Sequence, residues 1–422
     1  MKKRNEKHEK RVKRMIVACG LCAIILTAST YAWFIGMKTV NVTAFDVKIA
    51  AIDSLSLSLN GKDWSDTVEI NEANDKTASY DGNTNSWGGE GLVPMSSVGK
   101  IDTTSSRMIL FEKGSFTVTP GGYRIMASQV KNDGAEEAKG YVAFDLFIKN
   151  LSGNEYYTEN NVLNEEAIYL TPESEVKVNA AGLEGDTANI ENSGIENSVR
   201  VAFAQIGRVK STQPETAITG ITCKTAGDVT GICDDVHTQI WEPNDTKHVQ
   251  NAVNWYTSSC KKRTGADLTL AESYNGTCGT VSNGTAYPTY AVSGTIIETD
   301  QVDNYDGAEY NGYAGSVSET AATGKLMAYP YFTDTMKNLE GNDRPQFITL
   351  APNSVTKVRI YVYLEGQDVD NYDFASLGRQ ISVAFGFTKE RYYGDDINYN
   401  DQEPHGPELP TNVNSRTTKG NQ

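Results

Sequence analysis

Histidine is scarce in this sequence of 422 residues, which has only four, and no HExxH pair marks a common zinc peptidase. The sequence also lacks a phosphate-binding loop, a dinucleotide-binding glycine motif and a nucleophile elbow. Basic residues are outnumbered, 38 against 54 acidic, giving a formal net charge of −16. This sign disfavours nucleic acid and anionic membrane surfaces as partners. We therefore expect a protein that is not an enzyme, has no nucleic-acid partner and needs no organic cofactor.

One uncharged apolar stretch, Met15 to Met37, follows a segment with eight basic side chains. At about 1.5 Å per residue a helix of this length reaches roughly 34 Å, enough to span a bilayer. Thr30 and Ala32 are the small residues that a signal peptidase requires, which favours cleavage between Ala32 and Trp33. Residues 1–32 are predicted to be a signal peptide, with an uncleaved membrane anchor as the alternative. The protein is then secreted or displayed on the cell surface, and contacts the membrane only through residues 15–37.

The rest of the chain is strongly acidic and contains an even number of cysteines. The first 32 residues contribute +6 to the net charge of −16, so the remainder carries −22. Cys19 and Cys22 lie inside the apolar stretch, where we interpret them as small apolar residues. The other four fit two disulfides that each bracket a Gly/Thr-rich loop. Four cysteines allow three pairings, of which we favour Cys223 with Cys233 and Cys260 with Cys278.

Alternating apolar and polar residues predict an all-β protein with a sandwich core. The clearest strands are Phe45 to Ile49, Leu55 to Leu59, Tyr141 to Ile148, Val358 to Leu364 and Ile381 to Phe387, of which Tyr141 to Ile148 is expected to lie centrally in a sheet. Residues 33–204 and 326–390 are assigned to the sandwich, 205–325 to a cysteine-containing insertion or second small domain, and 391–422 to a disordered polar tail. Within the insertion, Val249, Ala252, Val253 and Tyr256 share one face of a predicted short helix.

Few residues suggest a metal or ligand site. A zinc site of Cys223, Cys233, His237 and His248 matches no finger spacing, and exported cysteines usually oxidise. Calcium suits acidic loops better, although solvated turns explain the same residues. The candidate calcium ligands are Asp300, Asp303 and Asp306 in one cluster and Asp368, Asp370 and Asp373 in another. Exposed tryptophans could stack on sugars, or pack in the core; these are Trp64, Trp87, Trp241 and Trp255.

The hexapeptide Ser29 to Phe34 (STYAWF) closes the apolar stretch and leads into an alternating strand. It resembles the export signals cut by the SipW-type signal peptidase in the TasA and camelysin family of Gram-positive surface and biofilm-matrix proteins. Weaker likenesses to this family lie in LSLSLNGKDW, from Leu55, and VRIYVYLEGQD, from Val358. The resemblance implies a jelly-roll-like antiparallel β-sandwich, cleavage after Ala32 and, for matrix-forming members, insertion of a freed N-terminal strand into the next subunit. Trp33 to Ile49 is the candidate donor, unless it is an ordinary first strand of its own sheet.

Three functions follow from this resemblance and from the composition. The first is an exported structural or extracellular-matrix protein whose partners are the signal peptidase and further copies or other surface proteins. The second is a surface adhesin or a carbohydrate- or protein-binding module that uses residues 205–325 to recognise its ligand. The third is a camelysin-like metallopeptidase, for which the sequence offers no recognisable metal motif.

Overall fold

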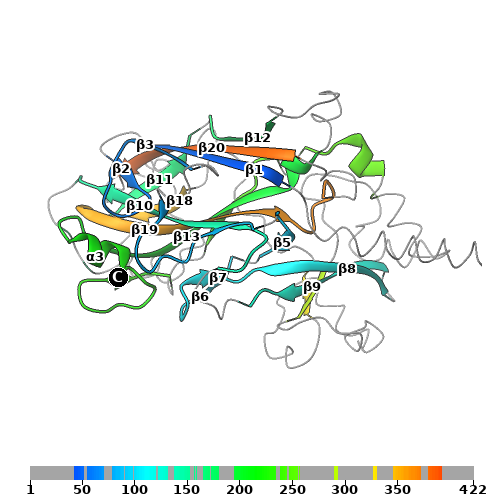
Figure 1. Ribbon diagram of the computed structural model, residues 1–422, viewed down its shortest axis with the longest axis horizontal. Coiled ribbons are helices and arrows are strands. Elements are labelled where there is room, and N and C mark those ends of the chain that lie inside the picture. The colour runs from blue at the N-terminus through cyan, green and yellow to red at the C-terminus, as the bar shows by residue number, and fades with distance from the viewer. Residues whose placement is uncertain are drawn as a thin grey trace, which may run out of the picture. The chain divides into compact units, whose positions relative to one another are not determined.

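The computed structural model shows a protein built mainly of β-strands (Figure 1), which confirms the all-β prediction. The residues described all belong to one compact unit, Val40–Gln422. They are 42–51, 55–70, 78–89, 91–97, 99–119, 122–131, 137–152, 156, 158, 165–171, 173–179, 194–233, 238–244, 247–254, 256, 289–292, 327–329, 346–371 and 379–391. Within these ranges, no helix combines the length and the apolar character needed to cross a bilayer.

Sheet 1 has six strands, and the first strand of the unit lies beside the last. β1 (Val42–Ala51) pairs in parallel with β20 (Arg379–Arg391), placing Val47 beside Val383. On its other edge β1 pairs antiparallel with β3 (Thr67–Ile70). β1 is therefore an internal strand of its own sheet. The remaining strands are β11 (Glu166–Leu170) and β12 (Glu175–Asn179), which both pair with β20, and β18 (Gln346–Leu350) beside β11.

Sheet 2 has twelve strands around a long central one. β19 (Ser354–Glu365) pairs antiparallel with β10 (Val142–Asn150) and with β13 (Val199–Lys210). The strand Tyr141 to Ile148 is thus central, as its sequence predicted. The shorter strands are β2 (Leu55–Ser58) and β4 (Ser86–Trp87) on β10, β14 (Thr230–Gly231) and β15 (Gln239–Trp241) on β13, and the series β5 (Pro94–Ser96), β8 (Phe111–Thr119), β9 (Gly122–Gln129), β16 (Thr289–Val292) and β17 (Met327–Tyr329).

Most of the pairs between described strands are antiparallel, as predicted for the sandwich, but β1–β20, β9–β16 and β5–β19 are parallel. Alternation in a sequence indicates which residues face inward and does not indicate strand direction. A parallel pair needs a long crossover connection, and for β1 and β20 almost the whole unit supplies it. The sequence therefore predicted both strands and missed their pairing.

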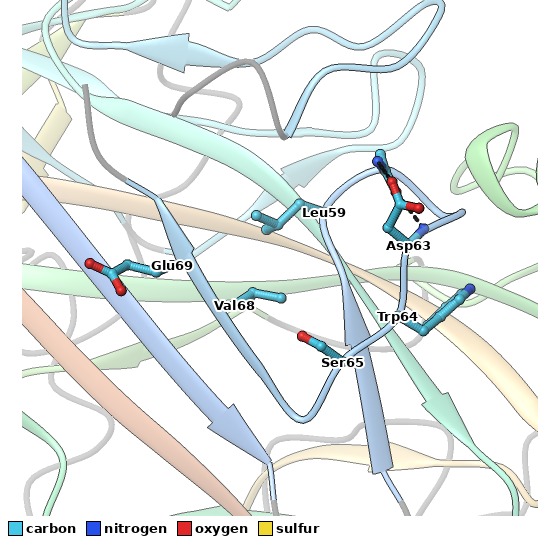
Figure 2. Close-up of a pocket in the computed structure, with 7 residues that line it drawn as sticks. Leu59, Asp63, Trp64, Ser65, Val68 and Glu69 are labelled. Carbon is cyan, nitrogen blue, oxygen red and sulfur yellow. Dashed lines mark hydrogen bonds between the residues drawn. The ribbon is translucent and has the colours of Figure 1, made fainter. Parts of the chain in front are cut away.

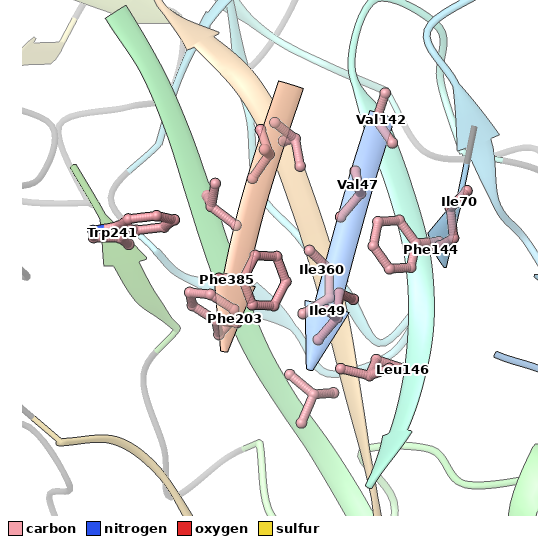
Figure 3. Close-up of a cluster of buried hydrophobic side chains, with 14 of the residues drawn as sticks. Val47, Ile49, Ile70, Val142, Phe144, Leu146, Phe203, Trp241, Ile360 and Phe385 are labelled. Carbon is pink, nitrogen blue, oxygen red and sulfur yellow. The ribbon is translucent and has the colours of Figure 1, made fainter. Parts of the chain in front are cut away.

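The main core lies where the two sheets face each other (Figure 3). It contains the inward rows of β10, β19 and β20 together with Val47 and Ile49 of β1. Phe203 of β13 and Phe385 of β20 meet edge to face, with ring centroids 5.4 Å apart. Each large apolar side chain buried in this way contributes about 1.5–3 kcal/mol. The alternation that predicted these strands is the pattern that this core requires.

The outer face of sheet 2, turned away from sheet 1, carries a second core. Its strand residues, such as Phe147 and Tyr361, alternate with those of the main core and are also fully buried. They are covered by the short strands β6 (Ile101–Asp102) and β7 (Arg107–Met108), by helix α3 (Glu215–Thr219) and by the loop closed by the Cys223–Cys233 disulfide. Both faces of β10 are therefore buried, which explains its almost continuous apolar sequence.

The predicted insertion, 205–325, shares residues with sheet 2. β13 extends to Lys210, and β14, β15 and β16 come from the same range. Residues 250–254 are helical, and Ala252 and Tyr256 are fully buried, in agreement with the predicted helix. The domain boundaries themselves stay predictions.

Candidate functional site

A polar cleft of about 530 Å³ lies against the outer face of sheet 2. Its floor is formed by Asp145 on β10 and by Lys357 and Arg359 on β19. Residues from three separate segments, most of them hydroxyl-bearing or acidic, form its walls. These are Tyr80, Asp81, Gly82 and Thr84, then Thr104, Ser105 and Ser106, and then Glu215, Thr216, Thr219, Gly220, Ile221 and Thr222 around α3.

Arg359 organises the floor of this cleft. Its Nε donates to Glu137 Oε1 at 2.9 Å, its Nη1 to Asp145 Oδ1 at 2.8 Å, and its Nη2 to the carbonyl oxygen of Thr84 at 2.7 Å. Asp145 and Arg359 lie directly opposite each other in the β10–β19 pairing, so strand register brings their charges together. Lys357 Nζ lies 3.3 Å from Asp145 Oδ2. Two cations therefore face two carboxylates, and the buried charges are balanced.

The balance fixes the ionisation of Asp145. Burial alone raises the pKa of this carboxyl, but the positive charges of Arg359 and Lys357 outweigh burial and hold the pKa at about 2. Burial and then the charge of Asp145 raise the pKa of the Tyr80 hydroxyl, which donates to Asp145 Oδ2 at 2.5 Å. Asp145 is therefore a fixed negative charge at neutral pH. With hydroxyls above it, the floor is suited to binding a polar ligand.

The structure brings together two of the predicted calcium ligands. Asp368 and Asp370 are buried, and their carboxylates lie with the His248 ring in a group of potential donors within 4.8 Å of one another. Asp368 Oδ2 accepts from Arg200 Nη2 at 2.7 Å, and Asp370 accepts from the Val249 N–H at 3.0 Å. A calcium ion there would lie against the Arg200 guanidinium and would need more oxygen ligands than the two carboxylates offer. Calcium binding at this cluster stays a prediction.

Arg200 also pairs with Glu242, and its positive charge acts on the nearby Glu365. Its Nε donates to Glu242 Oε1 at 3.0 Å, while Glu365 accepts from Ser96 Oγ and, at 2.9 Å, from the Gln367 N–H. Burial raises the pKa of Glu365 to about 7, against the opposing effect of Arg200. Glu365 therefore changes its charge close to neutral pH.

A second pocket, of about 320 Å³, lies beside the turn after β2 (Figure 2). Asn60 Nδ2 donates to Asp63 Oδ2 at 2.9 Å, and Gly61 has φ of 75°, as the Asn-Gly pair suggests. The positive φ favours glycine here, and a Cβ at Gly61 would also come within 3.1 Å of the Ile218 side chain, a tight contact. Trp64 borders the pocket, and Lys149 Nζ lies 3.8 Å from its ring centroid. Trp64 is the only tryptophan that lines either of these two pockets. The Lys149 ammonium group covers one face of its ring.

The other predicted residues divide into three groups. Cys223 and Cys233 form a disulfide, as predicted, which removes both sulfurs from the zinc set considered with His237 and His248. Trp87 stacks on Phe144 with centroids 5.8 Å apart, and Trp241 is fully buried, so both belong to the core. The following lie outside the described residues: Ala32, Trp33, His237, Trp255, Cys260, Cys278, Asp300, Asp303, Asp306 and Asp373.

Sequence reasoning missed the paired charges of sheet 2 and a polar cluster at the end of the main core. In the sequence, Asp145 stands out only as the one charged residue within the apolar strand Tyr141 to Ile148. Asn150 and Lys389 continue inward-facing apolar rows, at two residues after Ile148 and Phe387. A polar side chain that faces the core needs a hydrogen-bonding or charged partner there. The alternation of the sequence alone could therefore have predicted that Asn150 and Lys389 have buried polar partners.

Comparisons with protein-family models, with curated proteins and with solved structures found no match to this chain. Its function has to be inferred from its own residues.

Proposed function

We propose that the protein is an exported, non-enzymatic structural component of the cell surface or extracellular matrix, with a jelly-roll-like sandwich. The observation that carries this proposal is the position of β1. The strand begins at Val42, soon after the segment Ser29 to Phe34 that resembles an export signal, and it lies between β20 and β3. Cleavage after Ala32 would leave nine residues before the first strand of the core.

The same position suggests a route to assembly. β1 is held by backbone hydrogen bonds on both edges and by Val47 and Ile49, which are 1% and 0% exposed. If β1 left, β20 and β3 would present two open edges beside the vacated core positions. The β1 strand of a second copy offers the same backbone and the same side chains, so it can occupy this place. We therefore expect self-association through N-terminal strands.

Protein beginning at Trp33 tests this proposal. Concentrated samples should form oligomers or filaments, measured by light scattering and electron microscopy. Ile49→Lys places a charge on the buried face of β1 and should abolish assembly. Lys48→Glu is the matched control, since Lys48 is exposed and its neighbour Ile49 is not. A folded protein that stays monomeric at high concentration would refute the assembly.

A second function, recognition of a carbohydrate or other polar ligand, is favoured by the cleft over sheet 2. Residues around α3, from the range expected to recognise a ligand, line this cleft together with Thr104 and Ser105. Thr216→Arg should block the cleft, whereas Thr212→Arg, on an exposed position outside the lining, should not. Binding to a panel of soluble polysaccharides, measured by calorimetry, should be lost only in Thr216→Arg. Equal binding by both variants would exclude the cleft as the binding site.

A further inference from the structure

Three polar side chains from three strands meet at one end of the main core. Asn150 follows the buried Ile148 on the inward row of β10, Lys389 follows Phe387 on that of β20, and Glu166 begins the inward row of β11. Asn150 is fully buried, Glu166 is 8% exposed, and the Lys389 side chain is 10% exposed. An amine, a carboxamide and a carboxylate are therefore enclosed together where the apolar rows end.

One carboxylate oxygen contacts both of the other groups. Glu166 Oε2 lies 3.2 Å from Lys389 Nζ and accepts from Asn150 Nδ2 at 2.7 Å. Lys389 Nζ lies 3.4 Å from Asn150 Oδ1, which places the carboxamide carbon Cγ at most about 4.6 Å from the amine, since a C=O bond adds about 1.2 Å. Asn150 Nδ2 also donates to the carbonyl oxygen of Ala351 at 3.1 Å. The amide nitrogen faces acceptors, so its orientation is set by its hydrogen bonds.

The carbonyl oxygen of the same carboxamide is held by two further donors. The backbone N–H of Ser152 reaches Asn150 Oδ1 at 3.2 Å, and the Ser152 hydroxyl reaches it at 2.8 Å. Donors in this arrangement stabilise negative charge that develops on a carbonyl oxygen when a nucleophile attacks its carbon. The Ser152 hydroxyl also lies 2.6 Å from Glu166 Oε2. When Glu166 carries a proton it can donate to Ser152 Oγ, which frees the serine hydrogen for Asn150.

We propose that Lys389 and Asn150 are joined in the folded protein by an intramolecular isopeptide bond, formed with Glu166 as the proton carrier. In the first step the Lys389 ammonium passes a proton to Glu166, whose Oε2 lies 3.2 Å from Nζ, and this leaves a neutral amine. The amine Nζ then attacks Asn150 Cγ, and Ser152 stabilises the oxyanion on Oδ1.

The reaction balances without any further reagent. Glu166 gives its proton to Nδ2 and takes the second proton from Nζ, and the Cγ–Nδ2 bond breaks. Ammonia leaves and takes up the proton held by Glu166. One ammonium side chain and one carboxamide thus become one secondary amide and one ammonium ion, with no change in oxidation state.

A plain ion pair accounts for only part of this arrangement. It explains the contact of Lys389 with Glu166, but it does not require a carboxamide whose oxygen meets two donors. Lys247 and Asn244 make a useful comparison: Lys247 Nζ lies 2.9 Å from Asn244 Oδ1, while Asn244 Nδ2 donates to backbone carbonyls. Among the described residues no carboxylate contacts this second pair. It has the amine and the amide without the proton carrier.

The bond would tie the two sheets together. Asn150 ends β10 in sheet 2, and Lys389 lies in β20 of sheet 1, 239 positions along the chain. β20 also pairs with β1, the N-terminal strand. The crosslink would therefore fix β20, against which β1 is held.

The full-length purified protein provides the test. Its reduced, denatured mass should be about 17 Da below that of the sequence, the mass of one ammonia. Trypsin should release a branched peptide in which residues 150–177 are joined through Lys389 to residues 380–391, uncut at Lys389. Fragment ions from both arms separate this product from ammonia loss at any other asparagine.

Three variants complete the experiment. Glu166→Gln keeps the size and a hydrogen-bonding group but cannot accept a proton from the amine and give it back, so it should show the full mass and separate peptides. Lys389→Met should do the same, and both should melt at a lower temperature than the parent protein. Lys247→Met should keep the mass deficit. Folded parent protein with its full mass and two separate linear peptides would overturn the proposal, and so would a branched peptide that persists in Glu166→Gln.

Discussion

Replacing Arg359 by Met removes the cation that holds the floor of the cleft together. The variant loses hydrogen bonds to Glu137, Asp145 and Thr84, and it leaves two buried carboxylates with one cation, Lys357. Removing one partner from a buried ion pair typically costs about 3–5 kcal/mol, because the remaining charge is uncompensated. We expect a loss of this size in the free energy of unfolding.

The pH dependence of the loss follows from Asp145. Its pKa is depressed from 3.8 to about 2 in the folded protein, and a depressed pKa stabilises the fold above the unfolded pKa. This contributes about 2 kcal/mol at neutral pH and is lost as the pH falls through 2. Without Arg359, burial raises the pKa of Asp145. The difference between parent and variant should therefore be largest near neutral pH and shrink in acid.

Urea unfolding followed by circular dichroism at neutral pH and at about pH 3 measures both effects. Asp145→Asn in the Arg359→Met background should recover part of the loss, since one uncompensated charge is gone. Lys177→Met is the control, because its contact with Glu175 is solvent-exposed and should be worth less than about 1 kcal/mol. A loss below about 1 kcal/mol for Arg359→Met, or one equal at the two pH values, would contradict the reasoning.

Three further predictions concern stability. Cys223→Ser with Cys233→Ser opens a loop whose ends are 10 positions apart and should lower the free energy of unfolding by about 3 kcal/mol in urea titrations. The pKa of Glu365 is raised from 4.5 to about 7 in the folded protein, so its contribution to the free energy of unfolding is present below pH 4.5 and lost as the pH rises through 7. This pH dependence amounts to about 3 kcal/mol. Glu365→Gln should remove it from unfolding curves measured across that pH range. Phe385→Ala should cost about 3–5 kcal/mol and lower the melting temperature, because its ring packs on Phe203 and Trp241; an unchanged melting temperature would show that this ring is not part of a close-packed core.

The sequence predicted the strands well where one or both faces are buried. Val142 to Ile148 and Ile381 to Phe387 alternate as the main core requires, and both were predicted as strands. The Cys223–Cys233 disulfide followed from the short loop between the two residues. These features are local, so neighbouring residues determine them.

The features that sequence reasoning missed join residues far apart in the chain. Arg359 meets Asp145 across 214 positions, and Arg200 meets Asp368 across 168. Each residue alone looks like an ordinary charge in a polar chain. Strand pairing brings the members together, and alternation does not specify which strands pair or in which direction.

The N-terminal residue of the protein recovered outside the cell tests the central claim most directly. Export with cleavage after Ala32 predicts that sequencing finds Trp33 first, seven residues after Leu26. Met1 on protein that stays inside the cell would contradict the proposed export.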